Sequence, residues 1–259
     1  LVSGFEFESN TITITVNYDE HPADTELVLT NKNGGYVEVS ADLTSEIFTK
    51  YIISKCKKNS EDWITLETKN TSDVNILYKD YYAIPDVKFT YRLQTYNGAT
   101  LVETYYNEIE HTFKGCVIAD YYGAYFSDYD LETLPINKNE RMTTVETLDS
   151  KYAYGIINGA ADYESGSVKG LFTELRDDCK PDFNRSTQLP FSIIMLDWLN
   201  KGNAKFLKFG TGQAWIIYIT GAPSVESDDG DVLSNTQFSW TECADVFNSD
   251  VYPALGLTR

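Results

Sequence analysis

The residues best suited to chemistry lie in one stretch where tyrosines are mixed with carboxylates. The tyrosines are Tyr121, Tyr122, Tyr125 and Tyr129, and the acidic residues are Asp120, Asp128, Asp130 and Glu132. Aromatic rings can stack on the faces of sugars while their hydroxyls stay in water. The four tyrosines are therefore candidate contacts for a glycan or for another partner. The favoured alternative is a strand that buries the rings and leaves the hydroxyl groups hydrated.

Carboxylates are too abundant in this chain for a close pair to indicate an active site. The chain contains 39 acidic residues, so pairs such as Asp128 and Asp130 arise without a catalytic cause. Glycosidases require two carboxyl groups at a defined separation, which nothing here sets. Asp228, Asp229 and Asp231 could offer oxygen ligands to calcium. They lack the spacing and the closing glutamate of an EF-hand loop, which favours a solvated hairpin tip.

The sequence contains no other catalytic or cofactor signature. Only two histidines accompany four scattered cysteines, Cys56, Cys116, Cys179 and Cys243. A zinc site is therefore not expected, and free thiols in a protein made in a reducing cytosol are the default. There is no nucleophile elbow, no phosphate-binding loop and no apolar run of transmembrane length. We expect no enzyme, no cofactor, no metal and no membrane contact.

The chain is strongly acidic, with a formal net charge of −18 at pH 7. The residues before Gly115 contribute −8 and those after it −10, so the acidity covers the whole surface and is not a tail. Proteins that read nucleic acid through its phosphates need clustered lysine and arginine, so this class of partner is excluded. The charge indicates solubility, or a surface past which DNA slides without binding.

The composition predicts mostly β structure. The chain has 19 tyrosines and 13 phenylalanines, which suit a pleated, half-buried surface better than a helix. Alternation over residues 5–16 predicts a strand with one buried side. Turn residues at Asn33-Gly34-Gly35 and at residues 57–60 predict two hairpins, the second with Trp63 at its base.

Residues 84–97 carry a first resemblance to a known family. They read as an aliphatic residue, a proline and a turn residue, then Phe89-Thr90-Tyr91-Arg92-Leu93, and they close at Asn97-Gly98. This resembles the sixth strand of fibronectin type III domains, and the hairpin with Trp63 resembles the third strand and its partner. Phe89 aligns with the family's corner tyrosine and lacks its hydroxyl. The resemblance implies a fibronectin III/Ig-like β-sandwich over residues 1–114, serving as a spacer or a docking surface.

The segment from Thr143 to Phe172 predicts two strands joined by a corner. Residues 151–157 form an aromatic and β-branched run that stops at Asn158-Gly159, a strong turn signal. A second alternating run follows, in which Gly166 and Gly170 leave room for another backbone. Residues 137–141, just before this segment, are expected to form a basic loop.

One helix is predicted over about residues 189–201. Pro190 suits its first turn, and Thr187 or Gln188 is the candidate cap. The residues at helical spacing that form the expected buried stripe are Phe191, Ile194, Met195, Trp198 and Leu199, with Ser192, Asp197 and Asn200 facing away. A hairpin over residues 205–220 and a closing strand over residues 237–242 follow.

Several blocks between residues 115 and 245 resemble, in the same order, the tail-associated structural proteins of bacteriophages of Gram-positive hosts. The blocks are Gly115-x-x-Ile118-x-Asp120, Glu146-Thr147-Leu148-x-Ser150-Lys151-Tyr152, Tyr163-x-Ser165-Gly166-Ser167-Val168-x-Gly170-Leu171-Phe172, residues 198–208 and residues 237–242. The resemblance implies a tail-tube or distal-tail domain over residues 115–259, a β-sandwich or barrel flanked by one helix.

The same resemblance implies a role in assembly. Such a protein would form a homo-oligomeric ring, a hexamer or a trimer, and dock to other tail or baseplate proteins. DNA would pass through the ring without specific binding. The protein would reside in the virion tail after synthesis in the cytoplasm of the host bacterium. The alternative is a host-surface glycan-binding module of a phage tail or a bacterial surface protein.

Overall fold

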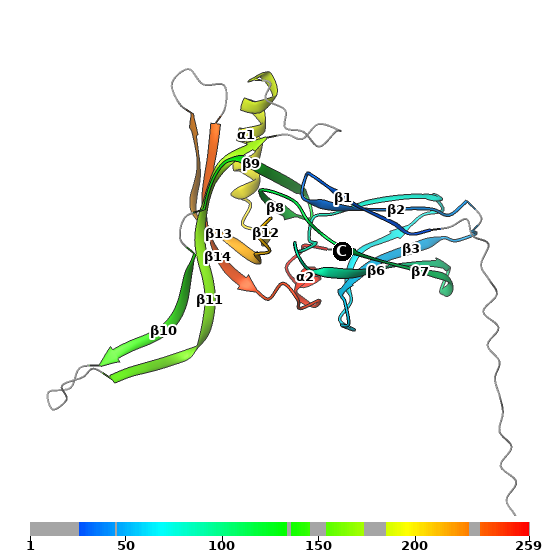
Figure 1. Ribbon diagram of the computed structural model, residues 1–259, viewed down its shortest axis with the longest axis horizontal. Coiled ribbons are helices and arrows are strands. Elements are labelled where there is room, and N and C mark those ends of the chain that lie inside the picture. Colours follow the sequence, from blue (N-terminus) through cyan, green and yellow to red (C-terminus); the bar gives the residue numbers. More distant parts are fainter. Residues whose placement is uncertain are drawn as a thin grey trace, which may run out of the picture.

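The computed structural model describes residues 26–44, 46–133, 136–145, 154–173, 185–227 and 234–258. The chain is mainly β, as its composition predicts, with two helices among these residues. A sandwich on the right of Figure 1 adjoins a second β structure on the left, against which helix α1 (Arg185–Leu199) packs. The strand predicted over residues 5–16 lies outside the described residues.

Two antiparallel sheets form the sandwich. The first has the order β1-β2-β5, with β1 at Val28–Lys32, β2 at Tyr36–Asp42 and β5 at Asn75–Asp80. The second has the order β4-β3-β6-β7, with β4 at Ile64–Asn70, β3 at Lys50–Lys57, β6 at Lys88–Asn97 and β7 at Thr100–Glu110. The hairpins β1–β2 and β3–β4 confirm the two turns expected from the sequence.

The second structure is a closed barrel of six strands. Its order is β8-β9-β11-β14-β13-β12 and back to β8, with β8 at Cys116–Asp120, β9 at Gly123–Thr133, β11 at Tyr154–Thr173, β14 at Ser234–Ala244, β13 at Ala214–Ser227 and β12 at Lys205–Phe209. The circuit closes because β11 pairs with both β9 and β14. Closure leaves these strands without an open sheet edge along their paired segments.

A two-stranded arm extends from the barrel. Strand β10 (Asn137–Val145) pairs with the first half of β11, and both run away from the barrel in Figure 1. The basic loop expected over residues 137–141 is therefore wrong, because these residues belong to β10. The tight turn expected at Asn158-Gly159 is also wrong, because β11 passes through both residues. Met142 pairs with Ile157 and Glu140 with Asp162, so the turn signal coincides with a bulge in a continuous strand.

Helix α1 (Arg185–Leu199) confirms the predicted helix but differs in its start and its buried face. The helix includes Thr187 and Gln188, so neither is its cap, and Pro190 lies beyond the first turn. Ile194 is 60% exposed whereas Ser192 is 2% exposed, the reverse of the prediction. Contacts of Met195, Trp198 and Leu199 with the barrel core set the orientation, and packing outweighs the hydropathy pattern here. A short helix α2 (Val251–Ala254) was not predicted.

One hydrophobic core joins the sandwich to the barrel. Val117, Phe206 and Ile216 of the barrel strands belong to the same buried cluster as Val39 and Leu93 of the sandwich. Tyr252 and Leu257, near the end of the chain, pack into this cluster as well. The two parts are therefore in direct apolar contact on either side of residue 115, where the domain boundary remains a prediction.

Replacing Gly115 by alanine is expected to lower the free energy of unfolding by about 3 kcal/mol. Gly115 has φ +101°, and a Cβ there would lie 2.2 Å from the backbone oxygen of Ser127. Gly98→Ala is the matched control, because Gly98 has φ +62° but no atom lies within 4 Å of its added Cβ. This control should lose only about 1 kcal/mol, from backbone strain. Urea denaturation measures both, and equal losses would contradict a steric role for Gly115.

Candidate functional site

Two of the four candidate tyrosines project from the turn between β8 and β9. Asp120 ends β8, and its Oδ1 accepts hydrogen bonds from the backbone N–H groups of Tyr122 (2.7 Å) and Gly123 (3.0 Å). This side-chain cap fixes the backbone of the turn. Tyr121 and Tyr122 are 44% and 62% exposed, and their rings lie 5.3 Å apart at 89°. The turn thus presents two aromatic rings at right angles.

A buried ion pair with Lys205 holds the Asp120 side chain in place. The Lys205 Nζ donates to Asp120 Oδ2 at 3.0 Å, and the two side chains are 0% and 1% exposed. The ammonium also lies 3.7 Å from the centre of the Trp198 ring, on α1. Burial lowers the pKa of Lys205, and the charge of Asp120 opposes this shift. The turn is consequently tied to both β12 and α1.

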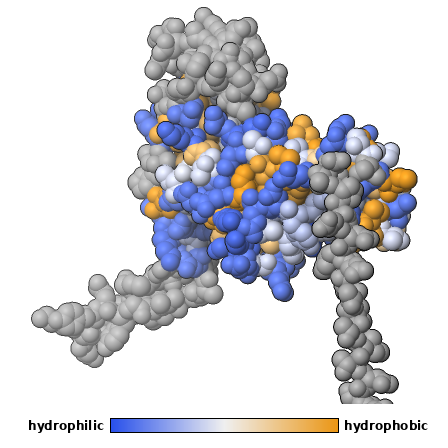
Figure 2. All heavy atoms as spheres, turned by 45° about the vertical axis from the view of Figure 1, so that its right-hand side comes forward, coloured by the Kyte–Doolittle hydropathy of each residue, from blue (hydrophilic) through white to orange (hydrophobic). Residues whose placement is uncertain are grey.

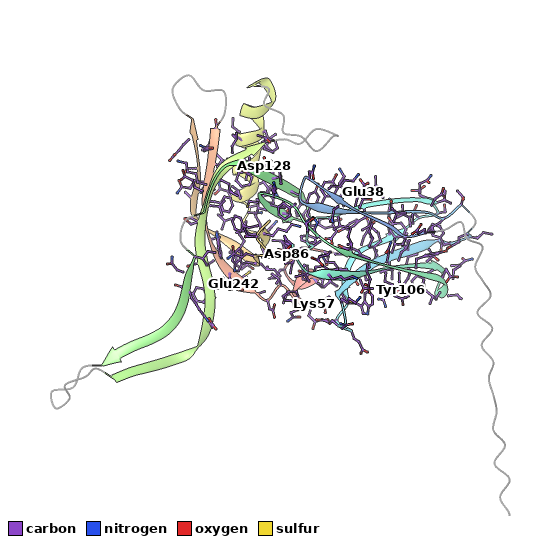
Figure 3. All side chains as sticks on the ribbon, in the orientation of Figure 1. Glu38, Lys57, Asp86, Tyr106, Asp128 and Glu242 are labelled. Carbon is purple, nitrogen blue, oxygen red and sulfur yellow. The ribbon has the colours of Figure 1, made fainter. Side chains whose placement is uncertain are left out.

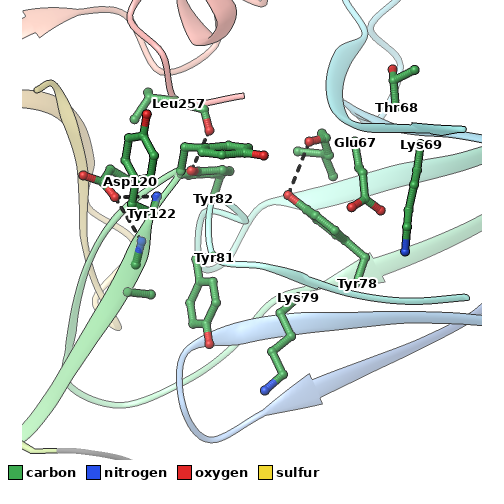
Figure 4. Close-up of a pocket in the computed structure, with 14 residues that line it drawn as sticks. Glu67, Thr68, Lys69, Tyr78, Lys79, Tyr81, Tyr82, Asp120, Tyr122 and Leu257 are labelled. Atoms are coloured by element: carbon green, nitrogen blue, oxygen red, sulfur yellow. Dashed lines mark hydrogen bonds between the residues drawn. The ribbon is translucent and has the colours of Figure 1, made fainter. Parts of the chain in front are cut away.

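The tyrosine turn borders a hollow of about 660 Å³ where the sandwich meets the barrel. Its lining includes three tyrosines of the sandwich, two of the barrel and four polar residues of β4 and β5: Tyr78, Tyr81, Tyr82, Tyr121, Tyr122, Glu67, Thr68, Lys69 and Lys79. Figure 4 shows how the sandwich and the β8–β9 turn contribute from opposite sides. The Tyr82 hydroxyl donates to the Leu257 carbonyl at 2.8 Å, which joins the lining to the C-terminal segment.

The other two candidate tyrosines, Tyr125 and Tyr129, are not among the described residues that line this hollow. The Tyr125 ring lies 4.7 Å from Trp198 and 5.2 Å from Phe191, so it packs with the barrel core. Tyr129 belongs to β9, and its side chain lies outside the described residues. Sequence reasoning missed the sandwich half of the lining, because Tyr81 and Tyr82 adjoin Tyr121 only through the tertiary contact between the two parts.

The candidate catalytic and metal-binding carboxylates form no site among the described residues. Asp128 and Asp130 are two positions apart on β9, and Asp128 is exposed. No group of three or more histidine, cysteine or acidic side chains that could hold a metal occurs in the described part of the chain. Asp228, Asp229 and Asp231 lie outside it. Cys56, Cys116 and Cys243 are free thiols, and Cys179 lies outside the described residues.

A second group of charged residues is buried inside the sandwich. Asp80 Oδ2 accepts hydrogen bonds from Lys55 Nζ (2.7 Å) and the Tyr91 hydroxyl (2.5 Å), and its Oδ1 accepts the Tyr82 backbone N–H (2.8 Å). Lys55, Asp80 and Tyr91 are each 0% exposed. Burial alone would raise the pKa of Asp80, but the charge and hydrogen bond of Lys55 lower it. These bonds connect β3, β5 and β6, and so cross between the two sheets.

This buried group includes a hydroxyl from the strand on which Phe89 lies. Tyr91, two residues further along β6, supplies a hydroxyl that reaches the end of β5 through Asp80. Lys208 of β12 approaches from the barrel, and its Nζ donates to the Ala83 carbonyl at 2.6 Å. Because Lys55, Asp80 and Tyr91 are sealed from solvent, this group has a structural role.

Comparisons with known proteins return few similarities. No protein-family model matches the chain, and no curated protein matches it. Among the solved structures, one described as "Tail of empty GTA particle computed with helical refinement, C6 symmetry" aligns with 51% of this chain and 92% of its own chain. The sequence identity is 15% and the TM-score 0.30. A similarity of this size defines neither a family nor a function for the chain.

Proposed function

We propose that the chain is a structural component of a bacteriophage tail or baseplate that forms a homo-oligomeric ring around the DNA channel. The observation that carries this proposal is the ordered set of sequence blocks between residues 115 and 245 that resemble phage tail proteins. Much of this region forms the barrel, and residues 198–208 join α1 to β12. A barrel with a flanking helix is the architecture that the resemblance implies. The protein resides in the virion tail and performs no catalysis.

The arm formed by β10 and β11 supports assembly. A ribbon of two strands is at best marginally stable in water, and its unpaired edges are templates for another strand. Within the described residues β10 pairs with β11 alone. In a closed ring each arm would meet the same surface of the next subunit, so one contact repeated by symmetry stabilises every arm.

The charge and surface of the chain suit a passage for DNA. Hydrophilic residues cover much of the described surface in Figure 2, with smaller hydrophobic areas between them. A ring that carries a charge of −18 per subunit repels DNA phosphates, so DNA passes without specific binding. None of the described helices is both long and apolar enough to span a bilayer.

The sandwich is proposed to be a fibronectin type III-like module that docks to a neighbouring tail protein. Its support is the sequence resemblance together with two antiparallel sheets in the orders β1-β2-β5 and β4-β3-β6-β7. Because the sandwich shares a core with the barrel, it would hold such a partner at a defined position relative to the ring.

The oligomeric state of the purified chain tests this proposal. Analytical ultracentrifugation should find three or six times the subunit mass of 29.3 kDa, alone or with neighbouring tail proteins, and negative-stain images should show rings. An arm-shortened variant can be made by replacing residues 140–162 with the turn Asn-Gly. Because Asn139 pairs with Tyr163, this two-residue turn can join them, which removes the outer part of the arm and keeps its base. This variant should remain folded and monomeric.

Tyr106→Ala is the control, because Tyr106 lies on β7 of the sandwich, on the opposite side of Figure 3 from the arm. It should assemble like the unaltered chain. A strict monomer that associates with no tail component would contradict the proposal. Rings formed equally well by the arm-shortened variant would reject the arm as the contact.

A further inference from the structure

We propose that the hollow between the sandwich and the barrel binds a short, uncharged oligosaccharide. Its volume of about 660 Å³ lies within the range of small-molecule sites. Five of its lining residues are tyrosines, contributed by both parts of the molecule. This function is separate from ring assembly, since the lining residues lie outside the arm.

The aromatic lining favours a sugar. The face of an aromatic ring is negative, and the C–H bonds on one face of a pyranose are polarised positively, so the two surfaces attract. The Tyr121 and Tyr122 rings are in edge-to-face contact at 89°, and both are substantially exposed, so each can still present an uncovered face. Rings set at right angles can contact two successive sugar units of a bent chain, or one unit from two sides.

The polar lining supplies both hydrogen-bond donors and acceptors. Glu67, Thr68 and Lys69 of β4 and Lys79 of β5 line the hollow (Figure 4). Glu67 accepts a hydrogen bond from the Tyr51 hydroxyl at 2.7 Å, which positions its carboxylate. Sugar hydroxyls donate and accept, so they match a lining of mixed character. A polyanion would require a lining of one charge.

The hollow is largely preorganised. The turn that carries Tyr121 and Tyr122 is capped by Asp120, which the buried Lys205 holds in place. On the other side, the Tyr82 hydroxyl is bonded to the Leu257 carbonyl. Side chains ordered before binding lose little entropy on binding, which lets weak stacking contacts yield measurable affinity.

The test is an array of uncharged di- to tetrasaccharides of glucose, galactose, rhamnose and N-acetylglucosamine, followed by calorimetric titration of the full chain with the best of them. Tyr122→Ala should weaken binding about tenfold, and Tyr121→Ala/Tyr122→Ala should abolish it. Tyr122→Phe should bind within about threefold of the unaltered chain, because stacking needs the ring and not the hydroxyl. Tyr106→Ala, which removes a 60% exposed tyrosine from β7, should bind normally.

Three results would overturn the inference. They are no binding of any of these sugars at about 1 mM, undiminished binding by the double variant, and preference for polyglycerol phosphate over every uncharged sugar. Circular dichroism of each variant identifies a loss that comes from unfolding. Titrating the arm-shortened variant as well separates the two proposals, since a chain that fails to form rings can still bind sugar.

Discussion

Asp80→Ala is expected to lower the free energy of unfolding by about 3–5 kcal/mol, because it leaves a buried ammonium without its counter-charge. Lys55 and Asp80 are both 0% exposed, and Lys55 Nζ donates to Asp80 Oδ2 at 2.7 Å. The variant also removes the acceptor of the Tyr91 hydroxyl and of the Tyr82 backbone N–H. Urea denaturation followed by tryptophan fluorescence measures the loss.

A double variant is the control for this interpretation. Lys55→Met/Asp80→Leu removes both charges and restores apolar volume, so it should lose less stability than Asp80→Ala. The pKa of Asp80 lies below its usual range, so its carboxylate stabilises the fold above about pH 4. This contribution disappears as the pH falls through the folded pKa of Asp80. In Asp80→Ala the free energy of unfolding should therefore fall less steeply at acid pH than in the unaltered protein. A double variant as unstable as the single one would contradict the ion-pair account.

Lys208→Met is expected to stabilise the protein at pH 7 by about 1–3 kcal/mol. Burial lowers the pKa of Lys208 well below its ordinary 10.5, although the charge of Asp80 opposes this shift. The unfolded chain therefore takes up a proton on this residue at a higher pH than the folded chain does. Between the folded pKa and about pH 10.5, stability rises with pH by up to about 1.4 kcal/mol per unit. Methionine has no proton to bind, so the variant should lack this slope.

The advantage of the variant should shrink towards pH 10. At that pH the neutral amine of Lys208 no longer destabilises the native protein, and the variant lacks the hydrogen bond from Lys208 Nζ to the Ala83 carbonyl, worth about 1 kcal/mol. Thermal denaturation from pH 6 to pH 10 measures the trend. Lys114→Met, at an exposed lysine near the same junction, should leave the pH dependence unchanged. Equal pH slopes in native protein and Lys208→Met would show that Lys208 does not cause the slope.

The sequence predicts the elements of this fold better than it predicts their surroundings. Alternation and turn residues identify the hairpins β1–β2, β3–β4 and β12–β13, because these signals act within a few residues. Asn158-Gly159 led to a wrong prediction of a turn, because the same residue types occur in turns and in β-bulges. Only the pairing of β11 with β10 shows that a bulge is present here. The reversed burial of Ser192 and Ile194 likewise depends on which face of α1 meets the barrel.

The candidate site could be predicted only in part for a related reason. Tyr121 and Tyr122 stand out locally, as aromatic residues beside Asp120 at the end of a strand. Tyr81 and Tyr82 become neighbours of that turn only through the shared core. The burial of Lys208 could not be predicted from its sequence neighbours either. A lysine in the pattern Lys205-Phe206-Leu207-Lys208-Phe209 would be expected to face solvent, but the sandwich covers the outer face of β12.

The shared core also has a mechanical consequence. Val117 and Phe206 on the barrel side, and Tyr252 and Leu257 from the end of the chain, interlock with sandwich residues, while Lys208 and Tyr82 add bonds across the junction. A hinge at residue 115 would have to open this packing before it could bend. The sandwich and barrel should therefore act as one stiff lever, in which a force applied at the tip of the sandwich turns the barrel directly.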